Sequence, residues 1–325
     1  MRLKSLNAQK IKAICVLSYN PTLGDSVIVS RLINSIVTKF PEIRIIILCP
    51  GSVKSVFSYF APQARIFTFN RNSRFILVRR FPKVERFFFR VKLIVFLTFT
   101  QILSMGKMKV LGPDWFSRVE FQRVHSSLKW LLFKRKSTAR LIDQSMTYYE
   151  FNFRQLLKAD LVHDSEKLLP IGKGDAKCQL VKKSQESFQV CIVSGAGCSE
   201  RDLVSLLLPE IIEVMDELQL DHFILDGNDG SLSLYQKFEL IQTSSLIICN
   251  DTGWYHVADA FKIPIICLSP RAANSYDGYI QSTESKLTIR TPKILPPTNG
   301  LGEAKNGLKN EISLCVKRLL QSRLS

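Results

Sequence analysis

The densest group of polar residues that could do chemistry is Asn250-Asp251-Thr252-Gly253, with His256 three residues further on. A carboxylate, a hydroxyl and a glycine between an apolar run and a helical pattern suit an anion-binding turn, because the first amides of a helix lack intrahelical partners. Gly253 allows close approach of a ligand, and Asp251 or Thr252 can cap the helix. The plainer alternative is a capped helix of any α/β protein, with His256 packed against a sheet.

A second group, Gly24-Asp25, follows an apolar strand predicted over 11–18 and precedes an amphipathic helix predicted over 26–40. A carboxylate at the head of a helix can serve as a general base towards a hydroxyl. It can equally be a helix cap. The residues alone leave both roles open.

A third group is the small-residue loop from Ser194 to Arg201, between a strand predicted over 188–193 and a helix predicted over 203–218. Glycine amides at a helix N-terminus can cradle an anion. The loop is not the dinucleotide fingerprint, so a Gly-x-Gly here is weak evidence on its own.

The elements that must position these groups indicate an α/β fold. Short apolar runs alternate with helical patterns, which predicts parallel sheets whose ligands bind at the carboxyl ends of the strands. The chain of 325 residues can hold two domains. We expect an N-terminal domain over 1–165, a linker over 166–187, where glycine, proline and lysine interrupt the pattern, and a C-terminal domain over 188–325. A last amphipathic helix, 306–324, is of a kind that often packs back on the N-terminal domain.

Composition narrows the class of protein. Hydrophobic residues make up 46% and charged residues 22%, as in globular proteins. We expect no signal peptide, and the most apolar run, 87–103, is interrupted by Arg90 and Lys92 and is too short to span a bilayer. The eight cysteines include no Cys-x-x-Cys, and five lie in predicted buried strands, which fits a reducing cytoplasm. No zinc or other metal site is expected.

Positive charge is concentrated in the first half of the chain. Residues 1–164 hold 28 Lys and Arg against 9 Asp and Glu, a net charge of +19, and the rest carries −2. Such a surface attracts polyanions such as nucleic acid, anionic lipid or a phosphorylated glycolipid. A solvated basic face is the alternative. Within this half, residues 115–136 could form a surface helix at a membrane interface or pack in the domain core.

Two stretches resemble a known family. LGDSVIVSRLINSIVTKFPEIRIIIL is similar to the N-terminal signature of glycosyltransferase family 9, the ADP-heptose:lipopolysaccharide heptosyltransferases. CNDTGWYHVADAFKIPIICL resembles that family's C-terminal signature, an Asp-Thr-Gly followed three residues on by His. The resemblance implies a GT-B fold, in which two doubly wound Rossmann-like domains face each other across a cleft.

The resemblance also implies a donor site. The family's Gly-Ala loop carries a Lys that holds the donor diphosphate, and that position is Arg201 here; the family's Trp two residues later is Leu203. Asp226 matches a strand-end loop near the nucleoside, and Leu232 a segment beside the adenine. The implied donor-binding residues are Ser194, Gly195, Ala196, Arg201, Asp226, Leu232, Asp251, Thr252, Gly253 and His256.

For the acceptor, the resemblance implies Asp25 as catalytic base and an anionic glycolipid that meets Gly24, Arg65, Arg71 and Arg74. The implied reaction is inverting transfer of a heptose from ADP-heptose to the inner core of lipopolysaccharide or lipooligosaccharide, without metal or cofactor. The implied location is cytoplasmic, peripheral on the inner membrane.

Three alternatives to this function stay open. The protein could transfer another nucleotide-activated sugar. It could be a non-catalytic member that binds a glycan or a nucleotide, which the changed residues at positions 201 and 203 would favour. Nucleic-acid binding is the weakest alternative, because no recognition motif accompanies the charge, and nucleic acid is not among the expected partners.

Overall fold

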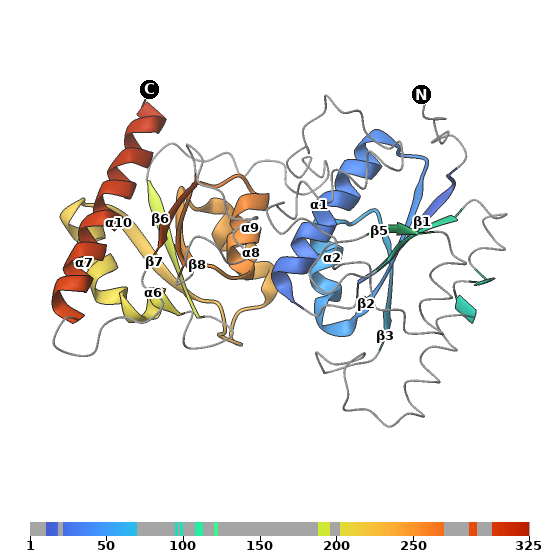
Figure 1. The fold of residues 1–325 in the computed structure, drawn as a ribbon, viewed down its shortest axis with the longest axis horizontal. Coiled ribbons are helices and arrows are strands. Elements are labelled where there is room, and N and C mark those ends of the chain that lie inside the picture. Colours follow the sequence, from blue (N-terminus) through green and yellow to red (C-terminus); the bar gives the residue numbers. More distant parts are fainter. Residues whose placement is uncertain are drawn as a thin grey trace. The chain divides into compact units, whose positions relative to one another are not determined.

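The protein consists of two α/β units (Figure 1). The computed structural model describes residues 11–18, 22–69, 95–96, 98–99, 108–112, 120–122, 188–195, 202–269, 286–290 and 301–324. The chain divides between Gly174 and Asp175 into two compact units, a point inside the predicted linker, 166–187.

The first unit is built on a five-stranded sheet with the order β3-β2-β1-β4-β5. Its strands are β1 (Ala13–Leu17), β2 (Arg44–Pro50), β3 (Arg65–Phe69), β4 (Met108–Gly112) and β5 (Glu120–Gln122), and its helices are α1 (Leu23–Lys39), η2 (Gly51–Val53) and α2 (Lys54–Phe60). The first four strands are parallel, and β5 pairs antiparallel with β4. Every residue of β1 is buried, as expected of a central parallel strand.

Two predictions for this unit are corrected. The first helix begins at Leu23 rather than Ser26, because Thr22 is its N-cap and accepts a hydrogen bond from the Asp25 amide. Gly24 and Asp25 therefore lie within the first turn. A surface helix over 115–136 is wrong for 120–122, which form β5. The alternation of polar and aromatic residues there fits a strand better than a helix.

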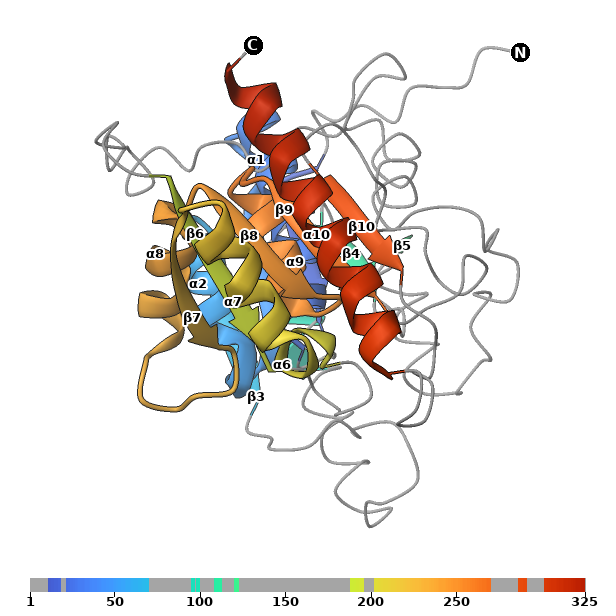
Figure 2. The same ribbon diagram turned by 90° about the vertical axis from the view of Figure 1, so that its left-hand side faces the viewer.

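The second unit is built on a five-stranded sheet with the order β10-β9-β8-β6-β7, in which all strands are parallel. Its strands are β6 (Gln189–Ser194), β7 (Asp221–Asp226), β8 (Leu246–Asn250), β9 (Ile265–Ser269) and β10 (Lys286–Arg290). Its helices are α6 (Leu203–Leu206), α7 (Leu208–Glu217), α8 (Leu234–Thr243), α9 (Gly253–Ala260) and α10 (Leu301–Leu324). Figure 2 shows α6, α7 and α10 on one face of this sheet. The predicted α/β class with doubly wound parallel sheets is confirmed.

The strand order of the second unit predicts where a ligand-binding crevice would lie. From β6 the chain first winds to one side, to β7, and then crosses to the other side, to β8. Loops leaving a sheet in opposite directions open a crevice outside the carboxyl ends of the two strands, here β6 and β8. The loop after β6 and the turn after β8 are the two that the sequence singled out.

Two features of the second unit were not predicted. The single helix expected over 203–218 is divided at Leu207, which ends α6 and precedes α7. Pro209 has no amide hydrogen and is tolerated only in the first turn of a helix, so a new helix starts there. The strand β10 also has no counterpart among the predicted elements.

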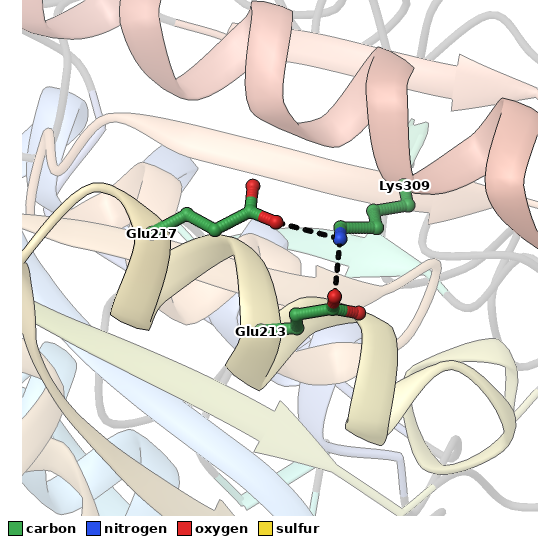
Figure 3. Close-up of polar contacts among 3 residues, drawn as sticks. All are labelled: Glu213, Glu217 and Lys309. Atoms are coloured by element: carbon green, nitrogen blue, oxygen red, sulfur yellow. Dashed lines mark hydrogen bonds and ion pairs between the residues drawn. The ribbon is translucent and has the colours of Figure 1, made fainter.

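The last helix, α10, packs against α7, β9 and β10 of its own unit. Its inward residues are Leu308, Ile312, Val316 and Leu319, all buried in the core. Lys309 Nζ lies 2.6 Å from Glu213 Oε1 and 2.7 Å from Glu217 Oε1 on α7 (Figure 3). The hydrogen bonds that Lys309 donates to Glu213 and to Glu217 raise its pKa, with the bond to Glu213 the larger cause. Packing of this helix against the N-terminal domain stays a prediction.

The strand cysteines are free and buried, as expected: Cys15, Cys49, Cys191, Cys249 and Cys267. Burial raises the pKa of Cys15 and of Cys49 to about 12, so both thiols stay protonated near neutral pH. Among the described residues, no group of three potential metal-binding side chains occurs. Within the same residues, no helix combines the length and the apolar character needed to cross a membrane.

Ile312→Ala should lower the free energy of unfolding of the C-terminal unit by about 2–5 kcal/mol, because it opens a cavity in the core. Leu314 on the same helix is 68% exposed. Leu314→Ala is the matched control and should change stability by less than about 0.5 kcal/mol. Urea unfolding measures both, and equal losses would contradict the packing of α10 described here.

Candidate functional site

The carboxyl ends of three neighbouring strands converge in the second unit. Ser194, the last residue of β6, is level with Asp226, the last residue of β7. Asn250 ends β8 on the other side of β6, where Cys249 is paired with Val193. The predicted loops of the C-terminal unit therefore meet along one edge of the sheet.

Asn250 joins the two sides of the crevice between β6 and β8. It is fully buried, and its side-chain amide donates to Asp202 Oδ1 at 2.9 Å. Its side-chain oxygen accepts from the Val204 amide at 3.0 Å. Both hydrogen-bonding groups of the Asn250 side chain are satisfied, as a buried amide requires.

The Asp202 carboxylate accepts hydrogen bonds from residues at the end of β6, at the end of β8 and in α6. Besides Asn250, it accepts from the Gly195 amide at 3.3 Å, the Ser205 amide at 3.2 Å and Ser205 Oγ at 2.7 Å. The N-terminus of α6 is therefore capped by the chain's own anion. In this structure the Gly195 amide hydrogen, which was expected to serve a bound diphosphate, is donated to Asp202; a role of Gly195 in donor binding stays a prediction. Ala196 and Arg201 lie outside the described residues.

Gly195 is required at the end of β6 for two reasons. Its φ of +84° lies in the left-handed region. A β-carbon there would lie 2.8 Å from Asn228 Nδ2 and 2.9 Å from Asp226 Oδ1. The exposed Asp226 carboxylate therefore stands directly beside Gly195, and its Oδ1 also accepts from the Asn228 amide at 2.8 Å.

The loop after β7 packs against the first turn of α9. The Gly227 amide donates to the Ser194 carbonyl at 2.9 Å. A β-carbon at Gly227 would lie 2.3 Å from Trp254 Nε1, closer than atoms can approach. Trp254 is 7% exposed and follows Gly253, so the indole lies under the loop that holds Asp226.

The side chain of Lys237 binds the same loop by hydrogen bonds to its backbone. Lys237 Nζ, from α8, donates to the carbonyl oxygens of Asp226 at 3.1 Å, Gly227 at 3.0 Å and Asp229. It also lies 5.8 Å from the centre of the Trp254 ring, within reach of a cation–π interaction. The ammonium group thus fixes the loop and the indole together.

The turn after β8 holds the other predicted donor residues. Asp251 and His256 are each 6% exposed, and Thr252 is the N-cap of α9. Thr252 Oγ1 makes no capping bond, and it is buried with no hydrogen-bond partner among the residues that the structure describes. A buried hydroxyl without a partner costs about 1–3 kcal/mol, a cost that a hydrogen bond to a polar ligand atom would offset.

Of the predicted residues of the first unit, Gly24 and Asp25 lie together in the first turn of α1, and Arg65 lies away from them on β3. Gly24 is buried in the first turn of α1. The Asp25 carboxylate accepts a hydrogen bond from Thr22 Oγ1, so the side chain takes part in capping α1. Arg65 is exposed on the edge strand β3, two strands from β1 and level with Cys15. The structure does not bring Arg65 to the start of α1, and Arg71 and Arg74 are outside the described residues.

Sequence reasoning missed Asp202, Asn228 and Lys237 as site residues, and took Asn250 only as part of the turn. A signal existed for Lys237, since it lies on the apolar stripe of α8 beside Phe238 and Ile241. Asp202 followed by Ser205 carried only the general pattern of a helix cap. Leu232 is half-buried in the loop before α8, and the Ser233–Gln236 capping box that starts this helix was also readable.

The model of one protein family matches the segment that forms this site. Glycosyltransferase family 9 (heptosyltransferase) matches residues 182–270. The resemblance to glycosyltransferase family 9 is confirmed. The matched residues contain β6 to β9 and the loops at the carboxyl ends of β6, β7 and β8. No curated protein matches the sequence.

Solved family 9 structures share the fold over almost the whole chain. A glycosyl transferase family 9 protein from Veillonella parvula has 14% identity and a TM-score of 0.60, covering 99% of each chain. E. coli heptosyltransferase WaaC with ADP has 15% identity and a TM-score of 0.59, covering 93% of this chain and 99% of that one. E. coli ADP-heptose lps heptosyltransferase II has 15% identity and a TM-score of 0.55, covering 96% and 100%. The predicted GT-B type of fold is confirmed.

Gly227→Ala should cost about 1–3 kcal/mol of stability, because the new methyl group displaces the Trp254 indole. Gly230 in the same loop has nothing within 4 Å of a β-carbon, so Gly230→Ala is the matched control. Thermal unfolding of the two variants checks the prediction. A Gly227→Ala protein as stable as the control would mean that the indole does not lie against this loop.

Proposed function

We propose that the protein is an inverting glycosyltransferase that transfers a heptose from ADP-heptose to the inner core of lipopolysaccharide or lipooligosaccharide. The observation that carries the proposal is the unpartnered Thr252 hydroxyl at the start of α9, inside the segment that matches family 9. Two similar structures support the donor, since they are of E. coli WaaC with ADP and with ADP-2-deoxy-2-fluoro heptose.

The donor diphosphate would bind at the N-terminus of α9. Its first amides and the helix dipole favour negative charge, and Thr252 Oγ1 can donate to a phosphate oxygen. Arg201 would add a cation that can bind phosphate in a bidentate manner. The Gly195 amide would stay bonded to Asp202. Asp226, beside Gly195 and exposed, would accept from the nucleoside.

In the reaction, charge builds up on the leaving diphosphate, and the α9 terminus and Arg201 would stabilise it electrostatically without a required metal. Asp25 would remove the proton of the acceptor hydroxyl as that oxygen attacks the anomeric carbon from the side opposite the diphosphate. The configuration of that carbon would invert. The acceptor is an anionic glycolipid reached from the cytoplasmic face of the inner membrane, and the basic residues of the first 164 positions would favour that surface.

Thr252→Val should change stability and ligand binding in opposite directions. The variant keeps the shape and removes a buried hydroxyl without a partner, so the free protein should be at least as stable as the wild type. Its affinity for ADP should fall about fivefold to tenfold, because one hydrogen bond to phosphate is lost. Calorimetry measures both quantities.

Thr243→Val is the control for this substitution, because the Thr243 hydroxyl is bonded to the Leu240 carbonyl at 3.0 Å in α8. It should leave ADP affinity unchanged. A Thr252→Val protein that binds ADP as well as the wild type would remove α9 as the diphosphate site. No binding of any nucleotide by the wild type would favour the non-catalytic glycan-binding alternative.

Asp25→Asn should reduce sugar transfer by at least about 100-fold, the usual contribution of a general base. Binding of the donor should stay nearly intact, and stability should fall by only about 0.3–1 kcal/mol, from the lost charge in the first turn of α1. Mass spectrometry measures turnover of the variant and of the wild type with ADP-heptose. The same assay with other ADP-sugars and with UDP-sugars identifies the sugar that is transferred. Repeating it with a chelator tests whether the reaction needs a metal. Retained turnover would exclude Asp25 as the base.

A further inference from the structure

Lys237 carries a charged ammonium group in a buried position, where the loss of hydration is unfavourable. It is 4% exposed, and in the described part of the chain no other lysine or arginine is buried to this degree. Removing an ammonium group from water is unfavourable unless other groups replace its hydration. The surroundings of Lys237 supply that replacement.

The three protons of the ammonium group match three carbonyl oxygens of one loop. The carbonyls belong to Asp226, Gly227 and Asp229, and each can accept a hydrogen bond from Nζ. Backbone carbonyls separated by one to three residues can all point inward at one atom only if the loop curls around it. The ammonium group therefore dictates the path of the chain from the end of β7 to Asp229.

Further contacts connect this loop to the first turn of α9 and to the end of β6. The Trp254 ring lies 5.8 Å from Lys237 Nζ and against Gly227, so the cation, the loop and the first turn of α9 are packed together. The Gly227 amide is bonded to the Ser194 carbonyl at 2.9 Å. The loop is thus attached to β6, α8 and α9 at once, and Asp226 at its start has little freedom to move.

The charge has an electrostatic consequence as well. Its hydrogen-bond acceptors are neutral carbonyls, so the positive charge persists under the loop. The pKa of Asp229 is lowered mainly by hydrogen bonds from Ser231, and the charge of Lys237 lowers it to a smaller extent. Asp229 is held by those Ser231 bonds on the exposed side of the loop. Asp251 directly precedes α9 and Asp226 belongs to the same loop, so the lysine charge alone does not set the potential at the start of α9.

We infer that Lys237 is a positioning residue of the nucleotide site: it holds the 226–229 loop and Trp254 in the conformation that receives a nucleoside diphosphate. The inference rests on the proposed function and deepens it. Lys237 itself lies below the loop and need not touch the ligand, so it acts through Asp226 and Trp254.

The test compares Lys237→Met with Lys317→Met, which makes the same change at an exposed lysine of α10. Hydrogen exchange of the amides from 227 to 231 should be about tenfold faster in Lys237→Met, and ADP affinity should fall about tenfold, as expected for the loss of a charged set of hydrogen bonds. Exchange in β6 and β8 should change little. Lys317→Met should match the wild type in both. If Lys237→Met yields no folded protein, Lys237→Gln, which keeps donors but no charge, is measured instead and should show the same two effects.

The outcomes separate the two proposals. A wild type that fails to bind ADP would overturn the proposed function and with it the role of Lys237 in nucleotide binding. A wild type that binds ADP, with a variant that binds equally well, would overturn only the inference. Uniformly faster exchange over the whole unit with unchanged ADP affinity would also overturn it, because Lys237 would then contribute to stability alone.

Discussion

The hydrogen bonds of Asn250 are the constraint on which the candidate site depends. At the end of β8 this buried side chain holds Asp202 with one group and the start of α6 with the other. A buried amide of this kind is tolerated only when both of its groups are bonded, and it then fixes its partners in one arrangement. The loop after β6 and the turn after β8 are thereby set in register across the crevice.

The N-termini of α6 and α9 differ in whether an anionic side chain of the protein already binds their amides. Both α6 and α9 begin at the carboxyl edge of the sheet, and either could attract an anion. Asp202 already fills the position at α6, where it collects the Gly195 and Ser205 amides. At α9 the N-cap is Thr252, whose hydroxyl has no partner in the described structure. Under the proposed function, the diphosphate would therefore bind at the N-terminus of α9 and not at that of α6.

The sequence predicted the fold well because the strands are short, apolar and bounded by turn residues. It located the turn after β8 for the same reason, since Asp251, Thr252 and Gly253 interrupt an otherwise apolar unit. It could not reveal that Asp202 would accept a hydrogen bond from the Gly195 amide, because that contact depends on tertiary structure and has no local sequence signal. The contacts of Lys237 were equally hidden: sequence shows a lysine on an apolar stripe but not three carbonyls curled around it.

The central claim is that α9, and not α6, receives the diphosphate. A crystal structure of the protein with ADP tests it most directly. The account predicts phosphate oxygens within hydrogen-bond distance of Thr252 Oγ1 and the first amides of α9, with the bonds from Asp202 to Gly195 and Asn250 preserved. Phosphates bound to the Gly195 amide, with the Asp202 carboxylate displaced from it, would contradict the account.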